Sequence, residues 1–328
     1  MNKTALRLPL KKHAQFFRSR PAIYIGVILA AVLATYAYKF RAETIFACTA
    51  SLYSSDRYLA YCNVASYADY EHGAFQFGLE PSAVDFTKKA EVLFLGNSRL
   101  QVAFSTAATS DWFSAASARY YLLGFGYFEN VVFVEGILCR IQPHAKVYVI
   151  NVDDFFAQWE TPPAKTVLHD PEAQNRYETK RLWQRIHEPV CKRFPALCGN
   201  SLVVFRSRET GAYTRRAIKQ QITPVSYDQL VDPDVVKSHT ASAIDFLSHL
   251  PVDRKCVIFT MVPTVGTKTG NVNAIAAALG DDLITPDIPA GLQTFDGSHL
   301  DQASAERWSQ AFFETAGTRI RSCLTEQQ

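Results

Sequence analysis

Short apolar runs alternate with longer, periodic segments over residues 89–323 of the 328-residue chain. Continuous apolar runs predict buried strands, and apolar residues that recur every three to four positions predict helices. Because the predicted strands alternate with the predicted helices, we expect an α/β fold with a parallel sheet that helices cover on both faces. The predicted strands are 92–95, 147–150 and 257–261, and the predicted helices are 127–141, 235–250 and 305–320.

An apolar stretch without charged residues occupies positions 21–38, between Arg20 and Lys39. As a helix, these 18 residues would extend about 27 Å, which is enough to cross the hydrocarbon core of a membrane. Tyr36 and Tyr38 stand at its distal end, where amphipathic rings favour the membrane interface. The pattern therefore predicts a basic tail over 1–20 and a transmembrane anchor over 21–38.

Charge is distributed unevenly about this stretch. Residues 1–41 hold eight basic and no acidic residues, whereas the remainder holds 26 basic and 31 acidic residues. The positive-inside rule then predicts a single-pass protein of the inner (cytoplasmic) membrane, with residues 1–20 in the cytoplasm and the C-terminal body in the periplasm. An acidic body disfavours nucleic acid as a partner. A cleaved signal, or a lipoprotein modified at Cys48, would deliver the same body to the same compartment.

Two further segments depart from the α/β pattern. Residues 39–88 are rich in tyrosine and weakly periodic, which indicates a packed juxtamembrane segment. Residues 155–230 are polar and rich in arginine, and either shape a substrate cleft as an insertion or form a peripheral subdomain. We expect basic side chains there, such as Arg206, Arg208 and Arg215, to be solvated surface charge, with contact to an acidic polymer as the alternative.

Seven cysteines suit an oxidising compartment. Two pairs are candidates for disulfides, and two further cysteines in apolar runs are expected to be buried thiols. No spacing of cysteine or histidine resembles a zinc site, and we predict no metal. The candidate pairs are Cys48 with Cys62 and Cys191 with Cys198, and the apolar runs hold Cys139 and Cys256.

A serine follows the first predicted strand, in the sequence Gly96, Asn97, Ser98. Parallel sheets bind ligands beyond the carboxyl ends of their strands, so a serine at this rim is a candidate nucleophile. A Gly-x-Ser sequence also arises by chance in a chain of this length. The alternative is that Ser98 is an ordinary N-cap of the helix that follows.

An Asp-x-x-His sequence precedes the last predicted helix. Asp296 and His299 are separated by a turn that contains Gly297. A histidine so placed can act as a general base toward a serine while the carboxylate supports its ring. The alternative is a helix-capping turn in which Asp301 is the N-cap and His299 is merely exposed.

The two motifs together, in this order, resemble the SGNH (GDSL-type) hydrolases over residues 89–320. The resemblance implies a three-layer α/β/α sandwich with a flavodoxin-like parallel sheet and no cofactor. It also implies that Ser98 is the nucleophile, His299 the base and Asp296 its carboxylate partner. With one N-terminal anchor, the chain looks like the membrane-tethered members that add or remove acyl groups on envelope and secreted polysaccharides.

The family also supplies oxyanion donors. It expects a glycine after the second strand, for which Gly124 offers its backbone amide. The family sequence Gly-x-Asn-Asp is represented here by Asn151, Val152, Asp153 and Asp154. The asparagine donor is therefore missing, replaced by Asp153, or supplied by Asn151. An ionised Asp153 would repel an oxyanion, and losing one donor typically costs about 3 kcal/mol.

We therefore expect a membrane-anchored serine esterase or O-acyltransferase that acts through a covalent ester of Ser98. Its expected substrate is an acylated polysaccharide or a small ester, and a multi-spanning acyltransferase is the expected protein partner. The alternative is a catalytically weak or inactive accessory protein that keeps the fold and binds a glycan or an acyltransferase. The acyl group and its acceptor are not legible in the sequence.

Overall fold

A mixed α/β body with a four-stranded parallel sheet forms the larger part of the protein. The computed structural model describes residues 13–64, 67–216, 221–280, 283–285 and 290–326, and of residues 13–20, Ala22 and Arg216 it describes the backbone only. The strand order in this sheet is β3-β2-β4-β8. The elements are α1 (His13–Glu43), η1 (Ile45–Ala47), β1 (Arg57–Cys62), α2 (Tyr70–Gln76), α3 (Pro81–Lys89), β2 (Val92–Asn97), α4 (Ser98–Phe104), α5 (Ala107–Ala116), β3 (Tyr120–Phe125), α6 (Val131–Ile141), β4 (Val147–Asn151), α7 (Pro162–His169), α8 (Ala173–Arg193), η2 (Pro195–Leu197), β5 (Val203–Ser207), β6 (Tyr213–Arg216), β7 (Thr223–Pro224), α9 (Pro233–Ser248), η3 (Arg254–Cys256), β8 (Val257–Thr260), α10 (Thr269–Ala278), β9 (Gln293–Thr294) and α11 (Gln302–Glu326).

The side chains of β2 alternate between two hydrophobic clusters, as the period of two in a strand requires. Leu93 and Leu95 belong to a cluster that includes the apolar side of α6. Val92 and Phe94 belong to another, which includes α4, α5 and α11. The strand is fully buried, which explains its continuous apolar sequence.

The helix predicted from residue 127 begins later, at Val131. Tyr127 and Phe128 both have positive φ angles, 62° and 56°, which are incompatible with a helix. Asn130 is the N-cap, and its side chain accepts a hydrogen bond of 3.0 Å from the amide of Val132. The apolar residues at 127 and 128 extended the periodic pattern without being helical.

A second sheet joins the juxtamembrane segment to the predicted insertion. It is antiparallel, with the order β1-β5-β6. β1 precedes the parallel sheet in the chain, while β5 and β6 lie within residues 155–230. These two regions are therefore parts of one structural unit. It contacts the parallel sheet between β5 and β6, where the carbonyl of Thr210 accepts a hydrogen bond of 2.9 Å from the amide of Leu122 in β3.

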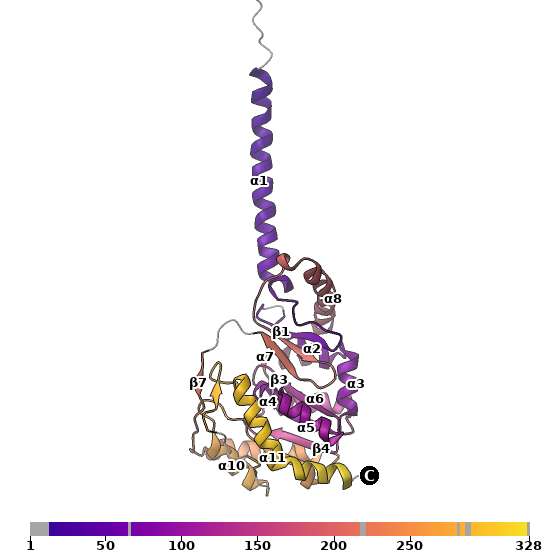
Figure 1. Ribbon diagram of the computed structural model, residues 1–328, viewed down its shortest axis with the longest axis vertical. Coiled ribbons are helices and arrows are strands. Elements are labelled where there is room, and N and C mark those ends of the chain that lie inside the picture. Colours follow the sequence, from indigo (N-terminus) through magenta and orange to yellow (C-terminus); the bar gives the residue numbers. More distant parts are fainter. Residues whose placement is uncertain (1–12, 65–66, 217–220, 281–282, 286–289, 327–328) are drawn as a thin grey trace, which may run out of the picture.

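Helix α1 projects from the body as a single rod (Figure 1). Its segment Ile23–Glu43 has a mean hydropathy of 1.7, and the apolar window within it has no buried residues. It is the one helix, among the described residues, that is long and apolar enough to cross a membrane. Thr44 alone separates α1 from η1, and its side chain accepts a hydrogen bond from the amide of Phe46.

Three disulfides are present in the described part of the chain. Two are the pairs expected from sequence, Cys48–Cys62 and Cys191–Cys198. The expectation of a buried thiol at Cys256 is wrong, because this residue forms a disulfide with Cys323 of α11. The expectation for Cys139 is also wrong, since it is a free, exposed cysteine on the outer side of α6.

Candidate active site

Ser98 begins α4 immediately after β2, at the carboxyl end of the parallel sheet. Its alternative role as a helix cap is filled by Asn97, whose Oδ1 accepts a hydrogen bond of 2.9 Å from the amide of Arg99. Gly96 lets the strand lie close to its neighbours, because a Cβ there would lie 3.2 Å from the Cβ of Asn151. The hydroxyl of Ser98 is thus left for another partner.

That partner is His299, which is brought to Ser98 across 201 positions of the chain. His299 Nε2 lies 2.8 Å from Ser98 Oγ, and His299 Nδ1 lies 2.8 Å from Asp296 Oδ2. The turn between the two residues uses a positive φ of 84° at Gly297. Asp301 does cap the next helix, accepting a hydrogen bond from the amide of Ser304, but His299 faces Ser98 rather than solvent alone.

The carboxylate of Asp296 is held in its ionised form. Burial raises the pKa of Asp296, but the hydrogen bond and charge of His299 and two backbone amides lower that pKa to about 2. An ionised carboxylate only accepts hydrogen bonds, so the proton of His299 lies on Nδ1. Nε2 then accepts the proton of the Ser98 hydroxyl, which is the arrangement a general base requires.

The imidazole of His299 is supported by a stack of side chains. Its ring lies parallel to that of Phe295, with centroids 5.6 Å apart. The guanidinium of Arg215 lies 3.8 Å from the centroid of the Phe295 ring. It also donates a hydrogen bond of 3.1 Å to the carbonyl of Leu300. Arg215 therefore holds both ends of the turn that carries the histidine.

Ser98 and His299 open into a cleft of about 310 Å³. Part of its wall comes from residues 155–230. Of the two interpretations of that region, an insertion that shapes a cleft and a peripheral subdomain, this contact agrees with the first. The expectation of solvated surface charge is wrong for Arg215, which lines the cleft. The remaining lining residues are Tyr61, Glu71, Val102, Gly126, Tyr127, Leu202, Val204, Tyr213, Phe295 and Asp296.

Part of this wall belongs to a buried network centred on Glu71, a residue that the sequence did not single out. Its carboxylate accepts hydrogen bonds from the amide of Gly126, at 3.0 Å, and from the hydroxyl of Tyr213. It also forms an ion pair of 3.0 Å with Arg206, whose side chain is 0% exposed. Arg206 is therefore a structural ion-pair partner and not solvated charge, and Arg208 likewise pairs with Glu80.

The oxyanion donor expected from Gly124 is not available. Its amide donates a hydrogen bond of 2.9 Å to Gln101 Oε1, and the residue is buried in β3. Gln101 reaches this position from α4 and also donates to the carbonyl of Gly211. A side chain from α4, the helix that Ser98 begins, thus occupies the donor, so the expectation for Gly124 is wrong in this structure.

Asn151 and Asp153 differ in what they can donate. Asn151 Oδ1 accepts a hydrogen bond of 2.9 Å from the amide of Val262, and its buried Nδ2 has no partner among the described residues. Asp153 forms an ion pair with Arg99. Burial raises the pKa of Asp153, while Arg99 opposes that rise. A paired carboxylate accepts hydrogen bonds and does not donate them.

Arg99 changes the expected electrostatics of the site. Its guanidinium compensates the charge of Asp153, and its Nε donates a hydrogen bond of 3.2 Å to Ser298 Oγ. It also lies 5.0 Å from the ring centroid of Phe128. Arg99, which directly follows Ser98, therefore reduces the repulsion expected between Asp153 and an oxyanion. The sequence offered two signals for this ion pair: an arginine directly after Ser98, and an aspartate at 153 where the family has an asparagine.

One group of potential metal ligands occurs in the described residues, at His187, Cys191 and Cys198. The two sulfurs form a disulfide and are not thiolate ligands. His187 instead contacts the carbonyl of Cys48 at 3.1 Å. We assign no metal or cofactor to this group.

Comparisons with protein-family models, with curated proteins and with solved structures give no match for this chain. What the site can do chemically rests on its own geometry. A hydroxyl, an imidazole and a carboxylate in one hydrogen-bonded row can activate the hydroxyl for attack on a carbonyl carbon.

Proposed function

We propose that the protein is a serine acyl-ester hydrolase or O-acyltransferase of the SGNH (GDSL-type) class. The observation that carries this proposal is the row Ser98, His299 and Asp296, joined by two contacts of 2.8 Å. The proposal includes a three-layer, flavodoxin-like arrangement about the parallel sheet. It also includes an inner-membrane anchor in α1, a periplasmic body and an acylated envelope polysaccharide or small ester as substrate.

In this mechanism His299 Nε2 takes the proton of Ser98 as Oγ forms a bond to the acyl carbon. The tetrahedral intermediate then expels the alcohol, which receives the proton from His299, and leaves an ester on Ser98. Water or a sugar hydroxyl attacks this ester and gives its proton to His299, which passes it to Ser98 Oγ as the serine is released. Asp296 stabilises the imidazolium in both steps.

We assign the oxyanion to the amide of Ser98 and to Nδ2 of Asn151. The Ser98 amide belongs to the first turn of α4, where helix amides lack partners within the helix. Asn151 Nδ2 is a buried side-chain donor without a partner among the described residues, and Asn151 ends β4, the strand that pairs with β2. The asparagine donor of the family could be missing, replaced by Asp153 or supplied by Asn151, and this assignment takes the third alternative.

The engaged amide of Gly124 favours a second candidate function. With one donor occupied, the chain would be a weak catalyst or an inactive accessory protein, which binds a glycan or a multi-spanning acyltransferase in the same cleft. The two candidates differ in whether Ser98 forms a covalent ester.

The test is labelling of the purified full-length protein with a fluorophosphonate, together with turnover of p-nitrophenyl acetate. We expect the label on Ser98, located by mass spectrometry, and loss of labelling and turnover in Ser98→Ala and His299→Ala. Both variants should unfold within about 1 kcal/mol of the parent. The matched control is Ser114→Ala, which removes an exposed hydroxyl from α5. A folded protein that takes no label would favour the accessory function.

A further inference from the structure

Helix α8 exposes a row of large apolar side chains rather than burying them. Its inner side packs through residues such as Tyr177 and His187, which are buried. The exposed row continues past the helix into the loop that the Cys191–Cys198 disulfide closes. Its members are Leu182 (56% exposed), Trp183 (37%), Ile186 (39%), Phe194 (56%) and Leu197 (53%), and we call them the apolar collar.

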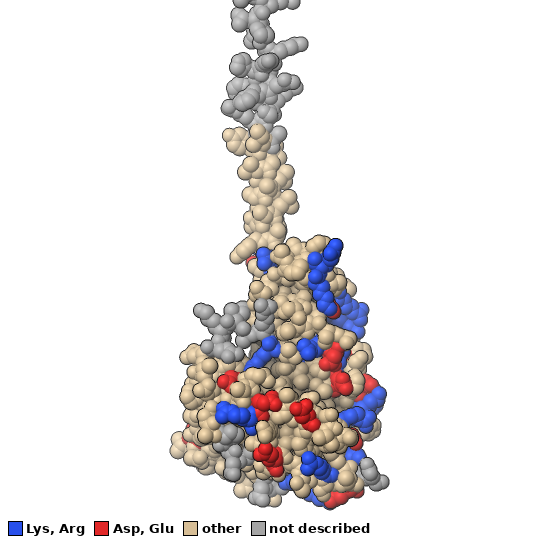
Figure 2. Space-filling model, in the orientation of Figure 1, with Lys and Arg blue, Asp and Glu red and all other residues tan. Residues whose placement is uncertain are grey.

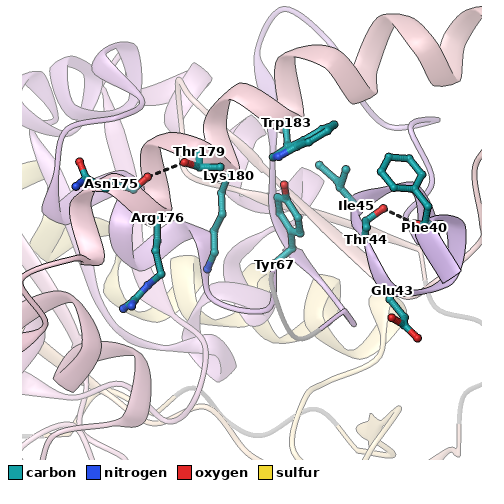
Figure 3. A pocket seen from close by; sticks show the side chains of 10 residues that line it. All are labelled: Phe40, Glu43, Thr44, Ile45, Tyr67, Asn175, Arg176, Thr179, Lys180 and Trp183. Atoms are coloured by element: carbon teal, nitrogen blue, oxygen red, sulfur yellow. Dashed lines mark hydrogen bonds between the residues drawn. The ribbon is translucent and has the colours of Figure 1, made fainter. Parts of the chain in front are cut away.

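The apolar collar adjoins the end of α1. The rings of Phe40 and Trp183 lie 6.2 Å apart, and Arg41 donates a hydrogen bond of 3.3 Å to the carbonyl of Cys198. Figure 3 shows Phe40, Ile45 and Trp183 gathered at one end of a cleft of about 540 Å³ between α1 and α8. Because only Lys39 separates Phe40 from the apolar stretch of α1, the neighbours of Phe40 stand near the level where that stretch ends.

Basic side chains accompany the collar. Residues 173–197 hold six basic and two acidic residues, although the body as a whole is acidic. Figure 2 shows blue side chains gathered over α8 beside the base of α1. Arg185 and Arg193 are exposed and form no ion pair with any residue that the structure describes, whereas Lys192 pairs with Glu188.

We propose that the apolar collar docks on the anionic phospholipid surface of the membrane that α1 crosses. Trp and Phe rings favour the headgroup layer, and apolar side chains beside them gain free energy by leaving water. Arg185 and Arg193 would meet lipid phosphates, which attract each basic residue near the surface. The inference depends on α1 crossing a membrane and is independent of the chemistry at Ser98.

The lipid surface fits the collar better than a free anion in the adjoining cleft would. Lys180 pairs with Asp69 and Arg176 with Asp170, so the cations that line the cleft are already compensated. The uncompensated charges lie on the outer side of α8, with the exposed apolar residues. An anionic phospholipid surface offers phosphates to the basic residues and an apolar layer beneath them to the apolar side chains.

The test places the full-length protein in nanodiscs of anionic phospholipid, some of which is brominated near the top of its acyl chains. Bromine quenches tryptophan fluorescence at short range. We expect quenching that is lost in Trp183→Phe and retained in the control Trp112→Phe, since Trp112 lies on α5 in the other half of the body. A second reporter, Phe194→Trp in the Trp183→Phe chain, should restore quenching through the disulfide loop.

The charge is tested separately, with the double variant Arg185→Gln and Arg193→Gln. We expect quenching of the Phe194→Trp reporter to fall to the level found in neutral nanodiscs. Insertion of α1 is measured independently of the collar, as the fraction of the protein that stays bound to nanodiscs in high salt. If the inserted chain shows no quenching at position 194, the proposal is overturned. Fluorescence that instead depends on protein concentration in detergent would overturn it in favour of a second copy as the occupant.

Discussion

The disulfide between Cys256 and Cys323 offers a prediction about stability. It ties the end of η3, directly before β8, to the C-terminal part of α11 and is buried at both ends. The loop that it closes contains Asp296 and His299. We consider the double variant Cys256→Ala and Cys323→Ala, which removes the bond and leaves small apolar side chains in its place.

The expected loss follows from the length of the closed loop. A disulfide that spans 67 positions lowers the entropy of the unfolded chain, which raises the free energy of unfolding by about 4 kcal/mol at 25 °C. The Cys191–Cys198 disulfide spans 7 positions, for which the same relation gives about 2 kcal/mol. The two double variants should therefore differ by about 2 kcal/mol in their free energies of unfolding.

The assay is urea unfolding of the full-length protein in detergent, followed by circular dichroism. The control is Cys139→Ala, which removes a free, exposed thiol and should change the free energy of unfolding by less than about 0.5 kcal/mol. If removal of the Cys191–Cys198 disulfide costs as much as removal of Cys256–Cys323, loop entropy does not govern these bonds and the reasoning is refuted.

Three further predictions concern the site. Asn151→Ala should lower kcat by roughly 10²-fold if its Nδ2 holds the oxyanion, and an unchanged kcat with intact folding would remove it from that role. Arg99→Ala leaves Asp153 buried without its partner and should cost about 3 kcal/mol in urea unfolding, with part of that loss recovered when Asp153→Ala is added. Asp296 has a pKa lowered from its ordinary value of 3.8 to about 2. Its contribution to stability should be complete above pH 3.8 and vanish as the pH falls through 2. Acid unfolding of Asp296→Asn should lack this component, and a curve identical to that of the parent would contradict the assignment.

The sequence predicted those features that depend on local pattern. The strands near 92, 147 and 257 are recognisable because a strand buried on both faces is apolar throughout. Ser98 and the pair of Asp296 and His299 were recognisable because each stands where a strand or helix boundary positions it. The structure then brings them together at hydrogen-bonding distance.

Features that depend on contacts distant in the chain could not be predicted in this way. The amide of Gly124 is occupied by Gln101, and nothing in the local sequence shows that a glutamine side chain from α4 reaches it. The pairing of β1 with β5 joins residues that are far apart in the chain, such as Tyr58 and Arg206, which are separated by 148 positions. Arg206, in β5, likewise seemed a surface charge because its partner, Glu71, lies 135 positions earlier in the chain, in α2.

A single residue, Thr44, stands between α1 and the first turn of the body. If α1 lies in a membrane, this short connection holds the cleft at a fixed distance from the lipid. A flexible linker would instead let the cleft move over a distance that grows with the length of the linker. The search for substrate is then two-dimensional, by diffusion of the whole protein within the membrane plane. Under the proposed function, acyl groups would be exchanged only in a thin layer at a fixed height above the lipid, and the protein would select its substrates by their position as well as by their chemistry.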